Sequence, residues 1–365
     1  MAEGVTRDDL RAAVASGVID EGQAILLQTL SDQRMGYRAN MVGDDEPFEL
    51  FKGFAEIFVT VGLGLLMAGL LGLTAIFGNL ALIPVAMMVL SIALALYFTK
   101  KRRMSLPSIA LCIGFALGLW GLMDAVLPDG RNATLSMGVA GMIGLAFYYL
   151  LFKLPFAMFV FGLFALMTVT GVVNIVEPPA SRGFVSSGDY LVDWLGLPRY
   201  FDLCNSPYMA VGTLIFGLMA FFAAIYFDSK DPHRVSRYAS TAFWLHILAA
   251  PALVNTLVMS NYAMGGIGTV IAIAILTVFT LLAVIIDRRS FLTAGLVYMG
   301  LLISQAVGDT GTEWAPVITM LVLGVFVTAL GAFWAQARAA IMGALPDFPG
   351  KERLPPYAAG LSVSD

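Results

Sequence analysis

Residues 80–124 read LALIPVAMMVLSIALALYFTKKRRMSLPSIALCIGFALGLWGLMD, and this stretch decides the fold. Two apolar runs flank four consecutive basic residues, Lys100–Arg103. A helix needs roughly 20 mostly apolar residues to cross the hydrocarbon core of a bilayer, and both runs are about that long. Because Lys and Arg are concentrated in cytoplasmic loops, the stretch predicts a transmembrane hairpin whose turn faces the cytoplasm.

The same pattern extends over most of the 365 residues, of which 59% are hydrophobic and 13% charged. Soluble domains carry about 25% charged residues. The apolar segments do not alternate with polar residues as barrel strands would, so helices are the spanning structure that satisfies their backbone. We predict an all-α, polytopic membrane protein with ten transmembrane helices within residues 51–340. The expected spans are 54–77, 80–99, 107–127, 135–151, 156–176, 207–227, 238–259, 266–286, 291–307 and 316–336.

The distribution of basic residues predicts the orientation. With the N-terminus in the cytoplasm, 18 of the 21 Lys and Arg residues lie on the cytoplasmic side. The exceptions are Arg131, Arg182 and Arg199. This bias satisfies the positive-inside rule, so we expect both termini in the cytoplasm and the lipid bilayer as the main partner.

The two ends of the chain are more polar than its middle. In residues 1–50, Thr6 and Asp9 have the spacing of a capping box, and Asp20 with Gln23 predicts a second helix start. We therefore expect a cytosolic helical hairpin followed by an acidic linker. Its lack of a basic face argues against nucleic-acid binding. The proline-rich residues 341–365 predict an extended cytosolic tail.

Two charged turns resemble each other. ALYFTKKRRMSLPSIAL at 95–111 and AAIYFDSKDPHRVSRYASTAFWL at 223–245 both pass from Tyr-Phe through charges to a small polar residue and a new span. The following turns, at 150–162 and 284–296, also correspond. These matches favour a parallel repeat of a four-helix unit over 80–176 and 207–307. The alternative is the apolar composition that all membrane hairpins share.

Five polar residues inside the spans are candidates for a membrane site: Asp124, Asn174, His246, Asn255 and Gln305. Under the repeat, Asp124 corresponds to Asn255 and Asn174 to Gln305, each 131 positions apart. Polar groups in spans are costly and often functional, so the two pairs predict a polar vestibule near the outer surface that binds a small solute or ion. The alternative is that the amides join helices by hydrogen bonds and Asp124 is hydrated.

His246 lies five residues before Pro251 in the seventh span. A histidine there can relay a proton, and the alternative is a structural side chain. Two scattered histidines do not make a metal site, and no nucleophile–base pair is visible. We therefore expect no catalytic residues, no cofactor and no metal, and no enzyme activity.

Small residues four positions apart predict close helix packing. They occur at Gly64, Ala68 and Gly72 in the first span and at Gly114 and Gly118 in the third. Glu56, one turn into the first span, predicts a helix-end contact with Lys52 at i−4.

The front hairpin LRAAVASGVIDEGQAILLQTL, the acidic-to-apolar transition FELFKGFAEIFVTVGLGLL, the many spans and the short Pro-rich tail together resemble the uncharacterised bacterial DUF2157-type membrane proteins. The resemblance covers the overall plan and the front module. It implies a bacterial inner-membrane protein, and that family has no settled activity or catalytic residues.

Two function classes stay open on the sequence. The first is a transporter or permease for a small solute, with a cavity lined by the five polar candidates. The second is a membrane scaffold or sensor whose hairpin, at residues 7–30, binds a cytosolic protein. The sequence slightly favours the transporter.

Overall fold

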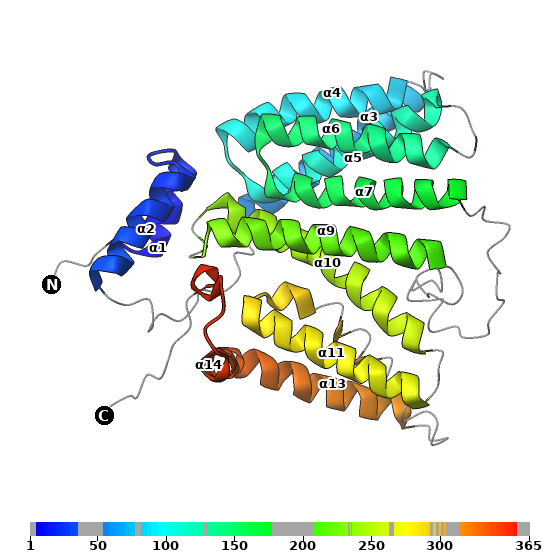
Figure 1. Ribbon diagram of the computed structural model, residues 1–365. Coiled ribbons are helices and arrows are strands. Elements are labelled where there is room, and N and C mark those ends of the chain that lie inside the picture. Colours follow the sequence, from blue (N-terminus) through cyan, green and yellow to red (C-terminus); the bar gives the residue numbers. More distant parts are fainter. Residues whose placement is uncertain are drawn as a thin grey trace. The chain divides into compact units, whose positions relative to one another are not determined.

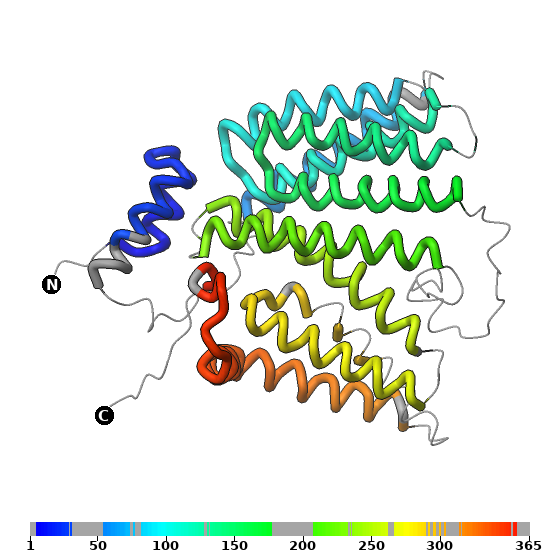
Figure 2. Tube along the Cα trace, viewed as in Figure 1, coloured from blue at the N-terminus to red at the C-terminus, as the bar shows by residue number. Residues whose placement is uncertain are grey.

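The computed structural model describes residues 5–35, 54–76, 82–127, 130, 132–176, 207–232, 234, 236–262, 266–292, 295, 296, 299, 300, 303 and 314–355 (Figures 1 and 2). All regular structure in these residues is helical. The chain divides into two compact units. The first-half unit is Phe48–Phe184, and the second-half unit combines Val185–Asp365 with Met1–Pro47.

The first-half unit is organised around its third helix, which packs against the other four. Its elements are α3 (Phe54–Ile76), α4 (Leu82–Ala95), the π-helical turn η2 (Leu96–Lys101), α5 (Ser105–Val126), α6 (Ala133–Phe152) and α7 (Pro155–Val176). Helix α5 begins where the carboxylate of Glu56 accepts hydrogen bonds from the backbone N–H groups of Ser105 and Leu106, each at 3.2 Å. A carboxylate at a helix N-terminus satisfies donors that have no partner inside the helix.

Glycines let several helices of this unit approach closely. The predicted packing role of Gly114 and Gly118 is confirmed, since a Cβ on Gly118 would lie 2.8 Å from the carbonyl oxygen of Pro84 on α4. On α7, a Cβ on Gly171 would lie 2.5 Å from backbone atoms of Leu135 on α6. By contrast, a Cβ on Gly64 would meet nothing within 4 Å in the described residues.

The second-half unit is organised around α10. Its elements are α1 (Arg7–Ser16), α2 (Glu21–Met35), α9 (Pro207–Lys230), α10 (Arg237–Tyr262), α11 (Gly266–Ile286), the 3-10 turn η5 (Arg289–Phe291), α13 (Ala315–Ala332), α14 (Trp334–Ala344) and the 3-10 turn η6 (Lys351–Arg353). Helix α10 packs on α9 and α11, and 78% of its most apolar window is buried. No other candidate span exceeds 39%, so α10 is the helix best shielded from lipid among those described.

The predicted capping box of α1 is confirmed. The Asp9 N–H donates to Thr6 Oγ1 at 3.2 Å, and the Thr6 N–H donates to Asp9 Oδ2 at 2.8 Å. At the other end of α1, Gly17 has φ 75°, the left-handed conformation that commonly ends helices.

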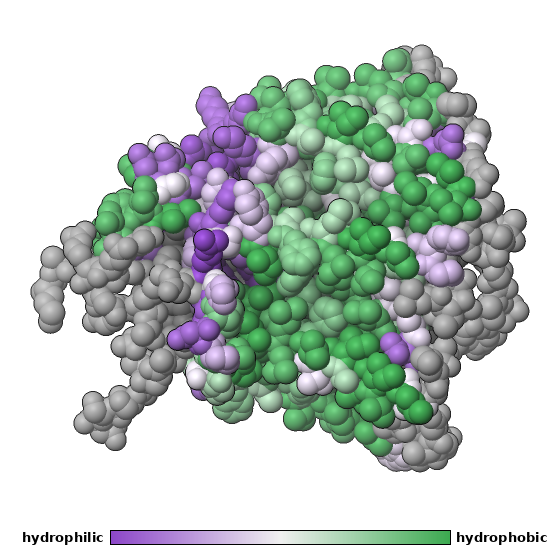
Figure 3. Space-filling view, in the orientation of Figure 1, coloured by the Kyte–Doolittle hydropathy of each residue, from purple (hydrophilic) through white to green (hydrophobic). Residues whose placement is uncertain are grey.

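Eight of the described helices are long and apolar enough to cross a membrane. A ninth candidate is the pair Pro316–Ala332 and Trp334–Ala344, which is bent by 70°. Most of the predicted span 291–307 lies outside the described residues, so the expected number of ten stays a prediction. Figure 3 shows hydrophobic residues over the lengths of the helices and hydrophilic residues gathered at helix ends. These features are compatible with a multi-pass membrane protein.

The two related turns share backbone features. Arg103 and Arg234 both have positive φ, at 53° and 56°, and each precedes by two residues a serine at a helix start. In both cases the backbone N–H of that serine donates to a carboxylate. Ser105 donates to Glu56, and Ser236 donates to Asp231. These local likenesses favour the repeat, which stays a prediction.

Candidate functional site

The second-half unit holds a network of buried charged side chains on α9, α10 and α14 and in the segments that follow α9 and α11. We call it the ion network, and its members are Asp228, Arg234, His246, Asp287, Arg288 and Arg338. Each is less than 9% exposed. Buried charges are costly unless they are paired and hydrogen-bonded, so the pairing inside the network is its central property.

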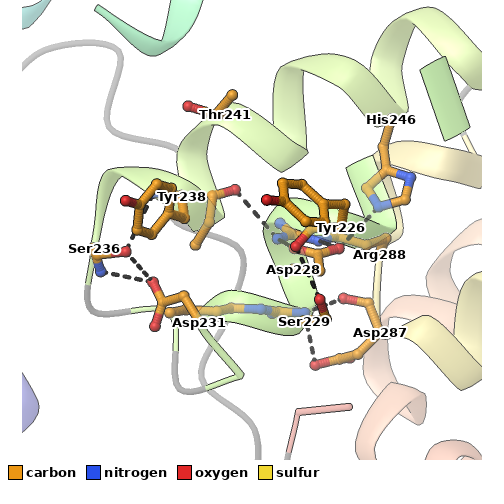
Figure 4. Close-up of polar contacts among 12 residues, drawn as sticks. Tyr226, Asp228, Ser229, Asp231, Ser236, Tyr238, Thr241, His246, Asp287 and Arg288 are labelled. Carbon is orange, nitrogen blue, oxygen red and sulfur yellow. Dashed lines mark hydrogen bonds and ion pairs between the residues drawn. The ribbon is translucent and has the colours of Figure 1, made fainter. Parts of the chain in front are cut away.

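Asp228, in the last turn of α9, accepts from two different elements (Figure 4). Its carboxylate accepts hydrogen bonds from both Nε and Nη2 of Arg288, and Nε lies 3.1 Å from Oδ2. The same Oδ2 lies 2.9 Å from Nε2 of His246 on α10. Two-pronged pairing of arginine with a carboxylate is the strongest form of this contact, and Nη2 of Arg288 also donates to the Ala239 carbonyl at 3.2 Å. Asp228 therefore joins α9, α10 and the segment after α11.

Asp287 enters the network because α11 ends there. Its N–H bonds to the Val284 carbonyl at 3.2 Å, and the Arg288 N–H bonds to the Ala283 carbonyl at 2.9 Å. This is the hydrogen-bond pattern of a Schellman helix end, which requires a left-handed residue. Asp287 supplies it with φ 56°, and aspartate tolerates this conformation better than most residues.

The Asp287 carboxylate receives donors from two other elements. Nη2 of Arg234, in the α9–α10 turn, lies 3.1 Å from Oδ2 and also donates to the Asp287 backbone carbonyl. Nε1 of Trp334 donates to Oδ1 at 2.7 Å, and Nε of Arg338 lies 3.7 Å from the same oxygen. Trp334 and Arg338 are on α14, so this carboxylate ties α14 and the α9–α10 turn to the end of α11.

Asp231 and Ser236 shape the turn that carries Arg234. Oδ2 of Asp231 accepts from both the N–H and the hydroxyl of Ser236 at 2.7 Å. The Ser236 hydroxyl in turn accepts from the Tyr238 N–H at 3.2 Å, as an N-cap residue does. The turn thus ends in a fixed start of α10, which positions Arg234 toward Asp287.

Helices α1 and α2 also contact this turn. Nε and Nη2 of Arg11 each lie 3.3 Å from the carbonyl oxygen of Arg234. Glu21, at the start of α2, pairs with Arg237 at the start of α10. Both contacts involve residues next to the ion network.

His246 is fully buried between aromatic rings. The rings of Phe221 and Phe291 lie 5.8 Å from its imidazole, centre to centre. Its Nε2 faces Asp228, whereas its Nδ1 has no hydrogen-bond partner within the part of the chain that the structure describes. One nitrogen thus contacts the network and the other lies in an apolar setting.

The predicted polar candidates are distributed over both units. His246 belongs to the ion network. Asn255 is buried on the same helix but nine residues further on, about 13.5 Å along the axis at 1.5 Å per residue, and so lies at another depth. In the first-half unit Asp124 is exposed near the end of α5, and Asn174 is partly buried on α7. Gln305 lies outside the described residues, so the predicted vestibule as a whole stays a prediction.

Sequence reasoning missed the other five members of the network. The count of basic residues placed the three arginines in cytoplasmic segments, and the expected spans 207–227 and 266–286 ended just before Asp228 and Asp287; charged residues at such positions are ordinarily hydrated. A signal was nonetheless present, because Asp228 directly follows Tyr-Phe and Asp287 directly follows Val-Ile-Ile, with no polar spacer.

Comparisons with known proteins return no relative: no family model, no curated protein and no solved structure matches the chain. Among the described residues, no group of three or more His, Cys, Asp or Glu side chains could hold a metal ion.

Proposed function

We propose that this protein is a multi-pass transporter for a small solute, and that the ion network is the gate at the cytoplasmic end of its second-half unit. The observation that carries the proposal is the convergence of Asp228 and Asp287 with Arg234, Arg288 and Arg338 at the ends of α9, α10, α11 and α14. Ionisable side chains at membrane helices are costly and are retained chiefly where they act.

Ion pairs suit a gate that must both close and open. When a buried pair separates into water, each ion regains its hydration, and this gain roughly offsets the lost attraction. An apolar seal has no such compensation, because exposing it costs about 25 cal/mol for each Å². A network of paired charges therefore separates at a smaller net cost than an apolar seal when water enters.

His246 supports the same proposal. It sits on the most buried of the described spans, five residues before Pro251, which removes one backbone hydrogen bond inside α10. A proline inside a membrane helix is a site where the helix can bend. His246 links the segment just before this point to Asp228, so bending of α10 and opening of the network would be coupled.

A second candidate function has its own observation. Apolar residues on α1, α2 and the turn between them are exposed, with Val18 at 76%, Leu26 at 63% and Leu30 at 51%. A scaffold or sensor that binds a cytosolic protein through this hairpin would need such a surface. A scaffold or sensor would not need an ion network that opens to water, and this difference distinguishes it from the transporter.

A solute screen tests transport directly. A bacterial host expresses the wild-type chain, the double variant Asp228→Asn/Arg288→Gln, or the control Asp347→Asn, whose side chain is fully exposed in its pair with Lys351. Mass spectrometry then compares solutes inside and outside the cells. We expect at least one solute to redistribute with the wild type and the control but not with the double variant. No redistribution beyond the empty host would contradict transport.

A further inference from the structure

The charged turn of the first-half unit is exposed rather than buried. We propose that this basic cluster, Lys100, Lys101, Arg102 and Arg103, is a binding surface for the phosphate headgroups of anionic phospholipids. The inference does not depend on the proposed transport function, because it concerns other residues in the other unit.

The bases of the cluster have no acid to neutralise them. All four side chains are exposed, and none forms an ion pair with a carboxylate in the described residues. The unit has two described acids. Glu56 is buried, and its carboxylate accepts hydrogen bonds at the N-terminus of α5. Asp124 lies 19 residues after Ser105 on the same helix, about 28 Å along its axis. Four positive charges within four residues are therefore open to solvent and available to an anionic partner.

The related turn of the second-half unit is a natural comparison. There Arg234 pairs with Asp287 and Arg237 pairs with Glu21. Where the second turn has Asp228 after Tyr-Phe, the first has Thr99. The turn of the second-half unit thus pairs two of its arginines with carboxylates of the chain, whereas no such pair forms at the basic cluster in the described residues.

The surroundings of the cluster fit a lipid surface. Lys101 and Arg102 each lie 5.8 Å from the ring centre of Tyr97, and Nε of Arg102 bonds to its hydroxyl at 3.1 Å. Tyrosine is enriched at the level of lipid headgroups. Leu96, next to Tyr97, is 51% exposed, so an apolar surface suited to lipid lies beside the charged side chains. Basic clusters that directly follow a span attract anionic lipid, by about 1 kcal/mol for each Lys or Arg, or roughly fivefold in affinity.

The test measures lipid binding to the purified full chain in neutral detergent. Native mass spectrometry counts bound phosphatidylglycerol and phosphatidylcholine for the wild type, for Lys101→Gln/Arg102→Gln, and for the matched control Lys230→Gln/Arg237→Gln. We expect the wild type and the control to prefer phosphatidylglycerol, and the cluster variant to lose about tenfold or more of that preference.

Two results would overturn the inference. The first is equal binding of the two lipids by the wild type, a measurement that needs no variant. The second is full displacement of phosphatidylglycerol by inorganic phosphate at equal concentration, which would make the cluster a site for free anions.

Discussion

Arg234 and Asp287 both have a backbone φ of 56°, and their side chains form a 3.1 Å ion pair across 53 residues of sequence. Left-handed backbone costs on the order of 1–3 kcal/mol for a residue with a side chain. The ion pair therefore joins the α9–α10 turn to the end of α11 through two residues that both hold this backbone conformation.

Replacing Arg234 by glycine tests the contribution of the side chain to stability without straining the backbone. Glycine adopts positive φ without strain, so Arg234→Gly keeps the turn and removes the whole side chain with its guanidinium. We expect a loss of about 3–5 kcal/mol of unfolding free energy, the usual cost of leaving one buried partner alone, and a lower midpoint of thermal unfolding in detergent. The control Arg103→Gly, at an exposed position of similar φ, should leave the midpoint unchanged or raise it. Equal effects of the two changes would contradict the role of the pair.

The pair Asp228 and Arg288 should behave non-additively. Asp228→Asn leaves Arg288 without its counter-charge, and Arg288→Gln does the converse, so each should cost about 3–5 kcal/mol of stability. The double variant removes both charges and keeps hydrogen-bonding groups, so it should be more stable than either single variant. Thermal unfolding of the four proteins forms a double-mutant cycle. Strictly additive losses would mean that the two side chains do not act as a pair.

Helix packing in the first-half unit gives a prediction free of charge effects. Gly171→Ala places a methyl group 2.5 Å from backbone atoms of Leu135, so α6 and α7 must separate. We expect a loss of about 1–3 kcal/mol, as overpacking ordinarily causes. Gly64→Ala meets no atom within 4 Å and should be neutral or slightly stabilising through helix propensity. A neutral Gly171→Ala would show that this close approach is absent.

The capping box of α1 predicts a pH effect. The Thr6 hydroxyl, followed by the Thr6 backbone N–H, hydrogen-bonds the Asp9 carboxylate and lowers its pKa below the ordinary value. A lowered pKa in the folded state means that the box stabilises α1 above the ordinary carboxyl pKa and stops doing so as the pH falls through the lowered value. Amide exchange of residues 9–13, corrected for intrinsic rates, should therefore speed up in acid. In Asp9→Asn the exchange should be faster at neutral pH and independent of this titration.

Local patterns predicted much of the fold. Hydropathy located eight of the expected spans, because the apolar character of a span is a property of each segment, and the Thr6–Asp9 spacing predicted the start of α1 because capping acts within one turn. The ion network could not be obtained this way. The partners of Asp228 and Asp287 are 60 and 53 residues distant, and the apolar residues directly before each aspartate do not identify the side chain with which it pairs. His246 was found by its depth alone, and its partner Asp228 was not.

If the ion network is a gate, it must open to water. The direct measurement uses Ala239→Cys in a chain whose Cys112 and Cys204 are replaced, because Ala239 is fully buried and its carbonyl accepts from Arg288. A charged, membrane-impermeant thiol reagent is added to inside-out vesicles, with the buried Ala272→Cys on α11 as control. We expect the reagent to label Ala239→Cys well above the rate of the control, and to label it faster still when Asp228→Asn/Arg288→Gln is added. Labelling no faster than the control, with and without Asp228→Asn/Arg288→Gln, would contradict the gate. The network would then be a static contact that holds the helices together.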